Sequence, residues 1–216
     1  MSRQLQPELL DSLAADHPDA RHSRRDLRLI NAIMGNQRWL ARTLARFLPA
    51  GGRILEIGAG TGELGRRLAA AGLPADGLDF APRPPDWPPA CDWHRADLLT
   101  FGGYDRYDAV VGNLIFHHLS NDELSVLGRT LGDSMRVIIA CEPARSRFSQ
   151  RLFACFAPLF LANHVTLHDA RISIAAGFRR DELPRLLGLN PAEWDCQCAT
   201  TLLGAYQMVA VRRARA

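Results

Sequence analysis

The stretch ILEIGAGTGELG at residues 54–65 places an apolar run, an acid and a glycine-rich turn in direct succession. Its glycines are Gly58, Gly60, Gly62 and Gly65. Where such a turn joins a strand to a helix, bare backbone N–H groups at the start of the helix can approach a ligand closely. The stretch therefore predicts a binding loop for a nucleotide-like cofactor.

Three kinds of ligand compete for this loop. A phosphate-binding loop of the Walker type needs Gly-Lys-Ser/Thr, and no lysine lies near it. Residues 60–65 match the G-x-G-x-x-G dinucleotide pattern, but they begin two residues after the expected end of the strand, where that pattern should start directly. In the other alignment Glu56 precedes Gly58. A carboxylate there would repel a pyrophosphate, but it suits a cofactor with a cationic amino-acid end.

The stretch NLIFHHLSNDEL at residues 113–124 offers side chains for acid–base chemistry. A neutral imidazole at His117 or His118 could take a proton from a phenol or a hydroxy acid. The competing interpretation is a packed, structural role for both rings. Glu142 follows a later apolar run, and it is a third candidate, either as a carboxylate behind the site or as a helix cap. The sequence predicts no metal site.

Strands and helices must hold these residues in place, and the spacing of the hydrophobic residues predicts where those elements lie. Expected helices include residues 62–71 and 120–132, the second opened by a capping box of Ser120 and Glu123. The β-α-β-α-β order predicts an α/β fold with a Rossmann-like, doubly wound, mostly parallel sheet. Expected strands lie at residues 53–58, 75–80, 91–97, 107–113 and 135–141, followed by a closing hairpin of strands at 194–201 and 204–212.

With the elements in place, LEIGAGTGELG resembles the first motif of class I S-adenosylmethionine (SAM)-dependent methyltransferases, hhExGxGxG with h apolar. The resemblance covers residues 53–210 in the expected order. It implies the class I methyltransferase fold with an antiparallel last strand, SAM as cofactor and S-adenosylhomocysteine as product. It also implies that Asp79 binds the ribose hydroxyls, that Asp97 and the N–H of Leu98 contact the adenine, and that Asn113 lies beside the transferred methyl group. The cofactor-binding set expected from it is Glu56, Gly58, Ala59, Gly60, Gly62, Asp79, Phe80, Asp97, Leu98, Asn113 and Trp39.

The expected domain organisation follows from the same resemblance. A capping box of Ser23 and Asp26 predicts the start of the first of two N-terminal helices, which in this family fold over the cofactor. The segment at 145–178 is longer than a crossover requires, and it predicts a helical lid insertion. We expect a loosely ordered N-terminus at residues 1–22 and a single methyltransferase domain at residues 23–216, with cofactor-covering helices at 23–50 and the substrate lid at 145–178.

The acceptor side carries no comparable motif. Asn113 and Phe116 bracket the position where base-amino methyltransferases carry Asn/Asp-Pro-Pro-aromatic, and the absence of both prolines speaks against a nucleic-acid substrate. The aromatic residues of the lid predict a pocket for an aromatic or alkyl group, with ordinary core packing as the competing explanation. Substrate-contacting candidates are Phe153, Phe156, Phe160, His164 and His168.

These observations predict a SAM-dependent methyltransferase that acts on a small, aromatic or polyketide-like hydroxyl acceptor, with O-methylation favoured. Residues 163–188 are similar to small bacterial methyltransferases of polyketide-type or quinone-type molecules. C- or N-methylation, a non-catalytic SAM-binding subunit of a partner enzyme, and a nicotinamide oxidoreductase remain as alternatives. The catalytic candidates are His117, His118 and Glu142.

Composition limits the expected partners and the expected cellular compartment of the protein. The formal net charge is +3 with a pI near 8.8, which does not by itself indicate a nucleic-acid partner. The five scattered cysteines favour a reducing, cytoplasmic compartment with free thiols. The longest apolar stretch, residues 151–163, is too short to span a bilayer, so we expect no membrane span. The oligomeric state stays open.

Overall fold

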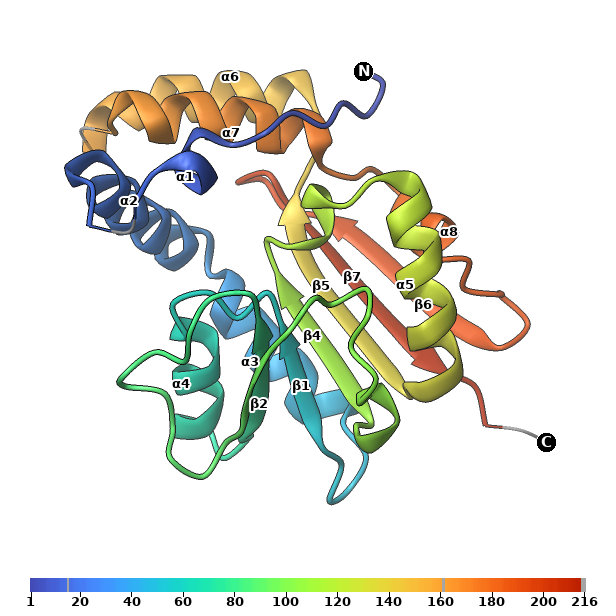
Figure 1. Ribbon diagram of the computed structural model, residues 1–216. Helices are drawn as coiled ribbons and strands as arrows, with labels where there is room; N and C mark the ends of the chain where they lie inside the picture. The colour runs from blue at the N-terminus through green and yellow to red at the C-terminus, as the bar shows by residue number, and fades with distance from the viewer. Residues whose placement is uncertain (15, 161, 215–216) are drawn as a thin grey trace.

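The computed structural model describes residues 1–14, 16–160 and 162–214, apart from the side chains of Leu159 and Phe160. A seven-stranded sheet in the order β3-β2-β1-β4-β5-β7-β6 forms its centre (Figure 1). Only β7 runs antiparallel to its neighbours, which confirms the predicted mostly parallel sheet with an antiparallel last strand. The strands are β1 (Ile54–Ile57), β2 (Ala75–Asp79), β3 (Trp93–Arg95), β4 (Ala109–Asn113), β5 (Val137–Pro143), β6 (Trp194–Thr200) and β7 (Ala205–Arg212).

Helices cover both faces of the sheet, as near-continuous apolar strands require. On one face lie α3 (Asn36–Phe47) and α4 (Glu63–Ala70), whose leucines pack on Val111 and Ile139. On the other face lie α5 (Asn121–Ser134) and α8 (Glu182–Leu186), which share a core with Val110 and Ile138. Neighbouring residues of β4 and β5 thus serve opposite cores, and both cores hold the strand ends in fixed positions.

Helix α5 begins as predicted, with the capping box of Ser120 and Glu123. In its interior Gly128 lies against the loop after α8, so that a β-carbon at this position would come 1.9 Å from the carbonyl oxygen of Leu187. A β-carbon at Gly132, one turn later, would meet nothing within 4 Å. The close approach at Gly128 is therefore what lets α5 and α8 share one core.

This difference gives a stability prediction. Gly128→Ala should lower the free energy of unfolding by about 2–3 kcal/mol, because the backbone of α8 must move away to admit the methyl group. Gly132→Ala should instead raise it by up to about 1 kcal/mol, since alanine favours the helix and meets no neighbour. Urea denaturation of both variants checks the prediction, and equal effects of the two substitutions would contradict it.

A layer of helices lies above the carboxyl ends of the strands (Figure 1). It contains α1 (Leu9–Ser12), α2 (Pro18–Met34), α6 (Arg147–Phe156), η3 (Ala157–Phe160) and α7 (His164–Ala176). We call this layer the cap. None of the described helices combines the length and the apolar character that crossing a bilayer would need.

The predicted start of the first N-terminal helix is wrong. Helix α2 begins at Pro18, where the ring of His17 accepts a hydrogen bond from the N–H of Asp19 at 3.2 Å. Ser23 and Asp26 lie inside this helix, and the buried carboxylate of Asp26 accepts a hydrogen bond from the hydroxyl of Thr166 at 3.0 Å. The aspartate that we assigned to a capping box therefore forms a hydrogen bond that connects α2 to α7.

Residues 1–14, which we call the strap, run along the cap and are held by side chains at both ends. Arg3 donates to the carbonyl oxygens of Leu119 at 2.6 Å and of Ala176 at 2.8 Å. The carboxylate of Asp169 accepts from the N–H groups of Leu9 at 2.8 Å and Leu10 at 2.9 Å, and so caps α1. Specific contacts thus place this segment, where the sequence predicted loose order at residues 1–22.

Candidate functional site

The glycine-rich loop follows β1 and leads into α4, as the sequence predicted. Gly58, Gly60 and Gly62 adopt φ angles of +63°, +53° and +75°, a region that glycine enters at low cost. At Gly58 a β-carbon would also come 2.6 Å from the side chain of Ile115. The loop is therefore folded tightly between the ends of β1 and β4, with Ala59 buried at its centre.

Trp87 supports the loop from beneath. This buried side chain comes from the proline-rich segment at 81–90, and it lies against the backbone of α4 and β2. A β-carbon at Gly65 would come 2.3 Å from its ring, and a β-carbon at Gly77 would come 2.9 Å from it. The indole N–H donates to the carbonyl of Cys91 at 3.2 Å, which satisfies its only donor.

Asp79 joins the end of β2 to the glycine-rich loop. One carboxylate oxygen accepts from the N–H of Gly60 at 2.7 Å, and the other accepts from the N–H of Ala81 at 2.7 Å. The next residue, Phe80, leaves 66% of its surface exposed, which is unusual for a side chain of this size. An acid held beside bare backbone, next to an exposed aromatic ring, can bind hydroxyl groups and stack against a flat ring.

Asp97 and Leu98 follow β3 on the same edge of the sheet. The carboxylate of Asp97 accepts from the N–H of Leu99 at 2.8 Å, and Leu98 is buried. The carbonyl of Leu98 accepts from the hydroxyl of Tyr104 at 2.7 Å. These bonds fix the turn after β3 beside the end of β2, where the sequence predicted the adenine to bind.

Glu56 is buried in the middle of β1, and its Oε2 has no hydrogen-bond partner among the described residues. Burial, together with the nearby charge of Asp79, raises the pKa of Glu56 to about 8. A buried acceptor without a partner costs free energy, which a cationic ligand would offset by favouring the charged carboxylate. The position of Glu56 thus fits a cofactor with a positively charged end.

The raised pKa has a measurable consequence for stability. Between the pKa of an unfolded glutamate, about 4.3, and about 8, the folded protein keeps a proton that the unfolded chain releases. Stability must therefore fall as the pH rises through this window, by at most about 1.4 kcal/mol per pH unit, and level off above it. Glu56→Gln should remove this contribution. Urea denaturation of both proteins from about pH 5 to about pH 9 checks it, and parallel pH profiles would contradict it.

An amide cluster joins the N-terminal helices to the end of β4. Asn31 Oδ1 accepts from Asn36 Nδ2 at 3.0 Å and lies 3.5 Å from Nδ2 of Asn113. Among the described side chains, Oδ1 of Asn36 and Oδ1 of Asn113 are buried without a partner, like Oε2 of Glu56. The sequence predicted Asn113 but missed Asn31 and Asn36. The sequence feature that could have pointed to these two asparagines is the Gly35-Asn36 interruption of the helical pattern, where the chain turns from α2 into α3.

His117 lies in η2 (Phe116–His118), directly after β4, and its Nδ1 is 2.7 Å from a carboxylate oxygen of Glu142. Both side chains are buried. Glu142 also accepts from the N–H groups of Ile115, Phe116 and His117, so it fixes η2 as a whole. Burial lowers the pKa of His117, but the hydrogen bonds and charges of Glu142 and Glu8 outweigh it and raise the pKa to about 9.

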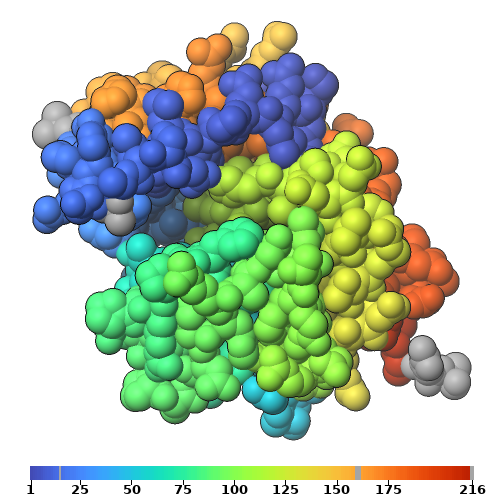
Figure 2. All heavy atoms as spheres, viewed as in Figure 1, coloured from blue at the N-terminus to red at the C-terminus, as the bar shows by residue number. Residues whose placement is uncertain are grey.

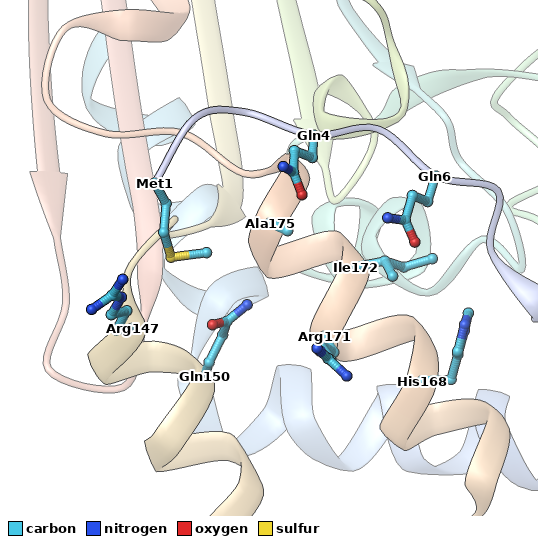
Figure 3. Close-up of a pocket in the computed structure, with 9 residues that line it drawn as sticks. All are labelled: Met1, Gln4, Gln6, Arg147, Gln150, His168, Arg171, Ile172 and Ala175. Carbon is cyan, nitrogen blue, oxygen red and sulfur yellow. The ribbon is translucent and has the colours of Figure 1, made fainter.

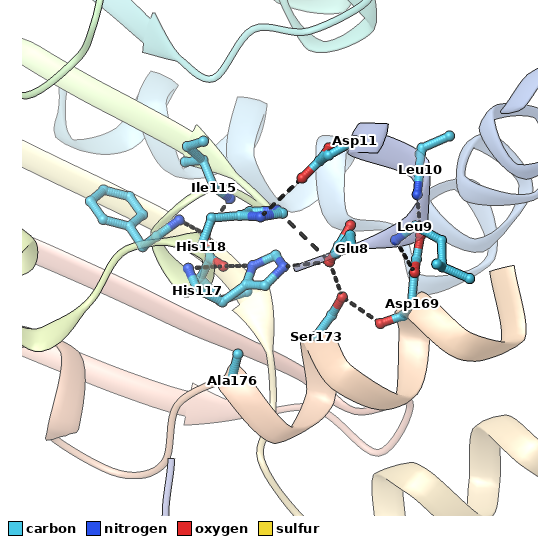
Figure 4. Close-up of polar contacts among 12 residues, drawn as sticks. Glu8, Leu9, Leu10, Asp11, Ile115, His117, His118, Asp169, Ser173 and Ala176 are labelled. Carbon is cyan, nitrogen blue, oxygen red and sulfur yellow. Dashed lines mark hydrogen bonds and ion pairs between the residues drawn. The ribbon is translucent and has the colours of Figure 1, made fainter. Parts of the chain in front are cut away.

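His118 faces the strap on the outer side of η2 (Figure 4). Its Nε2 lies 3.9 Å from Oε1 of Glu8, and its Nδ1 lies 4.0 Å from Oδ2 of Asp11. Burial and the charge of His117 lower the pKa of His118, whose side chain is still 32% exposed. Glu8 was not among the predicted residues, yet it contacts both histidines. No local pattern marks it, because it lies far from them in the chain.

The structure places the predicted lid residues on α6, η3 and α7. Phe156 is 50% exposed, Phe153 is half-buried, and the side chain of Phe160 lies outside the described part of the chain. His168 lines a groove of about 460 Å³ between the strap, α6 and α7 (Figure 3). None of the residues that line this groove belongs to the glycine-rich loop. His164 is exposed at the start of α7, and Trp39 packs half-buried against the core under α3.

The space-filling view in Figure 2 shows a hollow in the surface beside the cap. Between the blue strap and α2 above and the teal and green loops below, the surface is hollowed (Figure 2). The strands of the sheet end at this level, with Asp79 closing β2 and Asn113 closing β4. The cap therefore overhangs the edge of the sheet where the candidate residues gather.

Comparison with known proteins shows which family and which solved structures this chain resembles. A family described as a methyltransferase domain matches residues 23–171. The search of curated proteins found no match. Solved structures with the same fold include the plantazolicin methyltransferase BpumL in complex with S-adenosylhomocysteine, with a TM-score of 0.69 at 11% identity over 92% of this chain and 92% of that one.

Two further solved structures are similar. Magnesium protoporphyrin IX methyltransferase (ChlM) from Synechocystis PCC 6803, with bound S-adenosylhomocysteine, has a TM-score of 0.52 at 16% identity over 97% of this chain and 90% of that one. The pyocyanin biosynthetic protein PhzM has a TM-score of 0.59 at 19% identity over 94% of this chain and 62% of that one. At these identities the likeness concerns the fold.

Proposed function

Because this chain belongs to the methyltransferase domain family and is a SAM-dependent methyltransferase, we propose that it methylates a hydroxyl group on a small, aromatic or polyketide-like acceptor. The cofactor supplies an electrophilic methyl group on a sulfonium and leaves as S-adenosylhomocysteine. The task left to the protein is to hold the acceptor in line with that methyl group and to receive the acceptor's proton.

The cofactor side of this proposal uses the carboxyl edge of the sheet. Glu56 and the acceptor oxygens of the amide cluster attract the cationic amino-acid end, since these buried atoms have no hydrogen-bond partner in the part of the chain that the structure describes. Asp79 accepts from the ribose hydroxyls, and the exposed ring of Phe80 stacks on the adenine. The complete proposed set is Glu56, Gly58, Ala59, Gly60, Gly62, Asp79, Phe80, Asp97, Leu98, Asn113 and Trp39.

The cap supports a small and largely apolar acceptor. Large hydrophobic side chains that are exposed gather on it, since eight of the twelve in the described residues belong to the strap, α2, α6 or α7. They are Met1, Leu5, Leu9, Leu29, Ile33, Phe148, Phe156 and Leu167. An acceptor that enters beneath the cap meets this surface, with Phe153, Phe160, His164 and His168 proposed as further contacts. Burial of its apolar part would supply most of its affinity.

The observation that carries the choice of a hydroxyl is the cluster of Glu8, His117 and His118, whose histidines lie on η2 shortly after Asn113 and whose glutamate lies on the strap. A hydroxyl is a weak nucleophile until its proton leaves, so its methylation benefits from a group that receives the proton. We place that role on this cluster, with His118 nearest to the exterior and Glu142 holding η2 in position.

The test is methyl transfer from labelled SAM to four acceptor classes: phenols, aliphatic hydroxy acids, primary amines and 1,3-diketones. The proposal expects turnover with the phenols or hydroxy acids and a label that is stable as an ether. Transfer restricted to amines or to carbon would contradict it. Calorimetry with SAM alone shows separately whether the cofactor side is intact, so that a poor choice of acceptor is not mistaken for an inactive protein.

A further inference from the structure

Two histidine rings of η2 point the same nitrogen at one carboxylate oxygen of the strap (Figure 4). Nε2 of His117 lies 3.5 Å from Oε1 of Glu8, and Nε2 of His118 lies 3.9 Å from the same oxygen. The three ligand atoms all lie within 4.8 Å of one another. Convergence of two imidazole nitrogens and a carboxylate oxygen on one point is the donor set of many zinc centres.

The spacing matches the size of such a centre. With metal–ligand bonds of about 2.0–2.1 Å in a tetrahedral site, two ligand atoms are about 3.4 Å apart. The pairs that involve Glu8 are at 3.5 Å and 3.9 Å. The two imidazole nitrogens lie within 4.8 Å of each other, so the histidine rings as well as the Glu8 side chain would move when all three ligands bind one ion.

The far side of the His117 ring has the partner that a metal-binding histidine needs, and the far side of the His118 ring faces an acid. Nδ1 of His117 is hydrogen-bonded to Glu142 at 2.7 Å, and Nδ1 of His118 faces Asp11 at 4.0 Å. A carboxylate on Nδ1 keeps the proton there, so that a metal ion has to displace a proton only from Nε2. Glu8 is itself held by the hydroxyl of Ser173. Hydrogen bonds to a second residue thus orient two of the three candidate ligands, His117 and Glu8.

Charge and access favour a cation at this point. Three carboxylates, those of Glu8, Asp11 and Glu142, face the two imidazoles. His117 is buried, but His118 is partly exposed and Asp11 is largely exposed, so an ion can enter from their side. Imidazole nitrogen suits zinc and similar transition metals, whereas magnesium and calcium prefer oxygen ligands alone.

We propose that Glu8, His117 and His118 form a binding site for one divalent transition-metal ion, of which zinc fits the donor set. The ion would connect the strap to η2 and leave a fourth position for water or an acceptor oxygen, whose proton it would make easier to remove. The sequence predicted no metal site, because Glu8 is separated from the histidines by more than a hundred residues. The inference is independent of the acceptor, since binding is measured on the protein alone.

The experiment titrates the full-length protein with Zn²⁺ after treatment with a chelator. We expect one ion per chain by calorimetry and a Tm raised by about 5 °C or more at a hundredfold excess over the Kd. Co²⁺ should give the visible absorption of a four-coordinate site. Hydrogen exchange of the strap should slow when Zn²⁺ is added, since the ion ties Glu8 to η2. Mg²⁺ at the same concentration should leave both the Tm and the exchange unchanged.

Variants locate the ion. His118→Ala and Glu8→Ala should each weaken Zn²⁺ binding by about 100-fold or more, and Glu142→Gln by about 10–100-fold. His164→Ala removes an exposed histidine outside the cluster and should bind Zn²⁺ as the native protein does. The Tm of each variant without metal shows that it is folded. Native binding weaker than about 100 µM, or binding that survives both His118→Ala and Glu8→Ala, as at a thiol site, would overturn the proposal.

Discussion

Asp79→Ala is expected to weaken SAM binding by about 100-fold or more while the protein stays folded. The carboxylate accepts from Gly60 and Ala81, and so holds the glycine-rich loop against β2. Hydrogen bonds to a charged group contribute about 1.5–3 kcal/mol each, and the variant loses those to the loop together with those proposed to the ribose. Loss of both the shape of the loop and a ligand contact explains the size of the effect.

Calorimetry with SAM measures the change, and circular dichroism with thermal unfolding reports on the fold. Asp92→Ala is the matched control, because Asp92 is an exposed acid in the turn that leads into β3. It should bind SAM like the native protein. If Asp79→Ala bound SAM within about threefold of native, the role proposed for this carboxylate would be lost.

In the metal-free protein, His118→Ala should lower kcat for methyl transfer to a hydroxyl acceptor by about 100- to 10,000-fold, the range over which general acid–base groups contribute. The dissociation constant of SAM should stay unchanged, because His118 lies on η2 and contacts the strap rather than the glycine-rich loop. Single-turnover measurements with saturating cofactor isolate this step from binding and product release.

His17→Ala serves as the control, since His17 is exposed just before α2 and belongs to neither the proposed cofactor site nor the proposed acceptor site. An acceptor offered as its pre-formed phenolate should be methylated by the variant more efficiently, because its proton has already left. An equal loss of kcat with phenol and phenolate would point to a structural effect of the substitution. An unchanged kcat with the phenol would remove His118 from the chemistry.

The sheet was the part of the fold that local sequence predicted best. The buried strands of the centre are short apolar runs between turn signals, and glycine or capping residues mark the helices that follow them. These signals act over a few residues, so reading them needs no knowledge of the tertiary fold. The closing hairpin was predicted for the same reason, and β6 and β7 pair as expected.

The strap and the amide cluster could not be predicted in this way. Glu8 becomes informative only when α7 and η2 bring Ser173, His117 and His118 around it. Asn31 and Asn36 look like ordinary helix-surface residues until β4 supplies Asn113. Asp26 misled the assignment of α2, since a buried tie to Thr166 and a helix cap use the same residue type. Long-range contacts decide all three cases.

The indole of Trp87 has a consequence for how this protein can evolve. It occupies the space that side chains at Gly65 and Gly77 would fill, and it touches both the helix after the glycine-rich loop and the neighbouring strand. A larger residue at Gly65 is tolerated only if position 87 becomes smaller, and a larger residue at Gly77 only if positions 87 and 93 both give way. These four positions form one epistatic unit, so descendants should change them in concert or keep all of them.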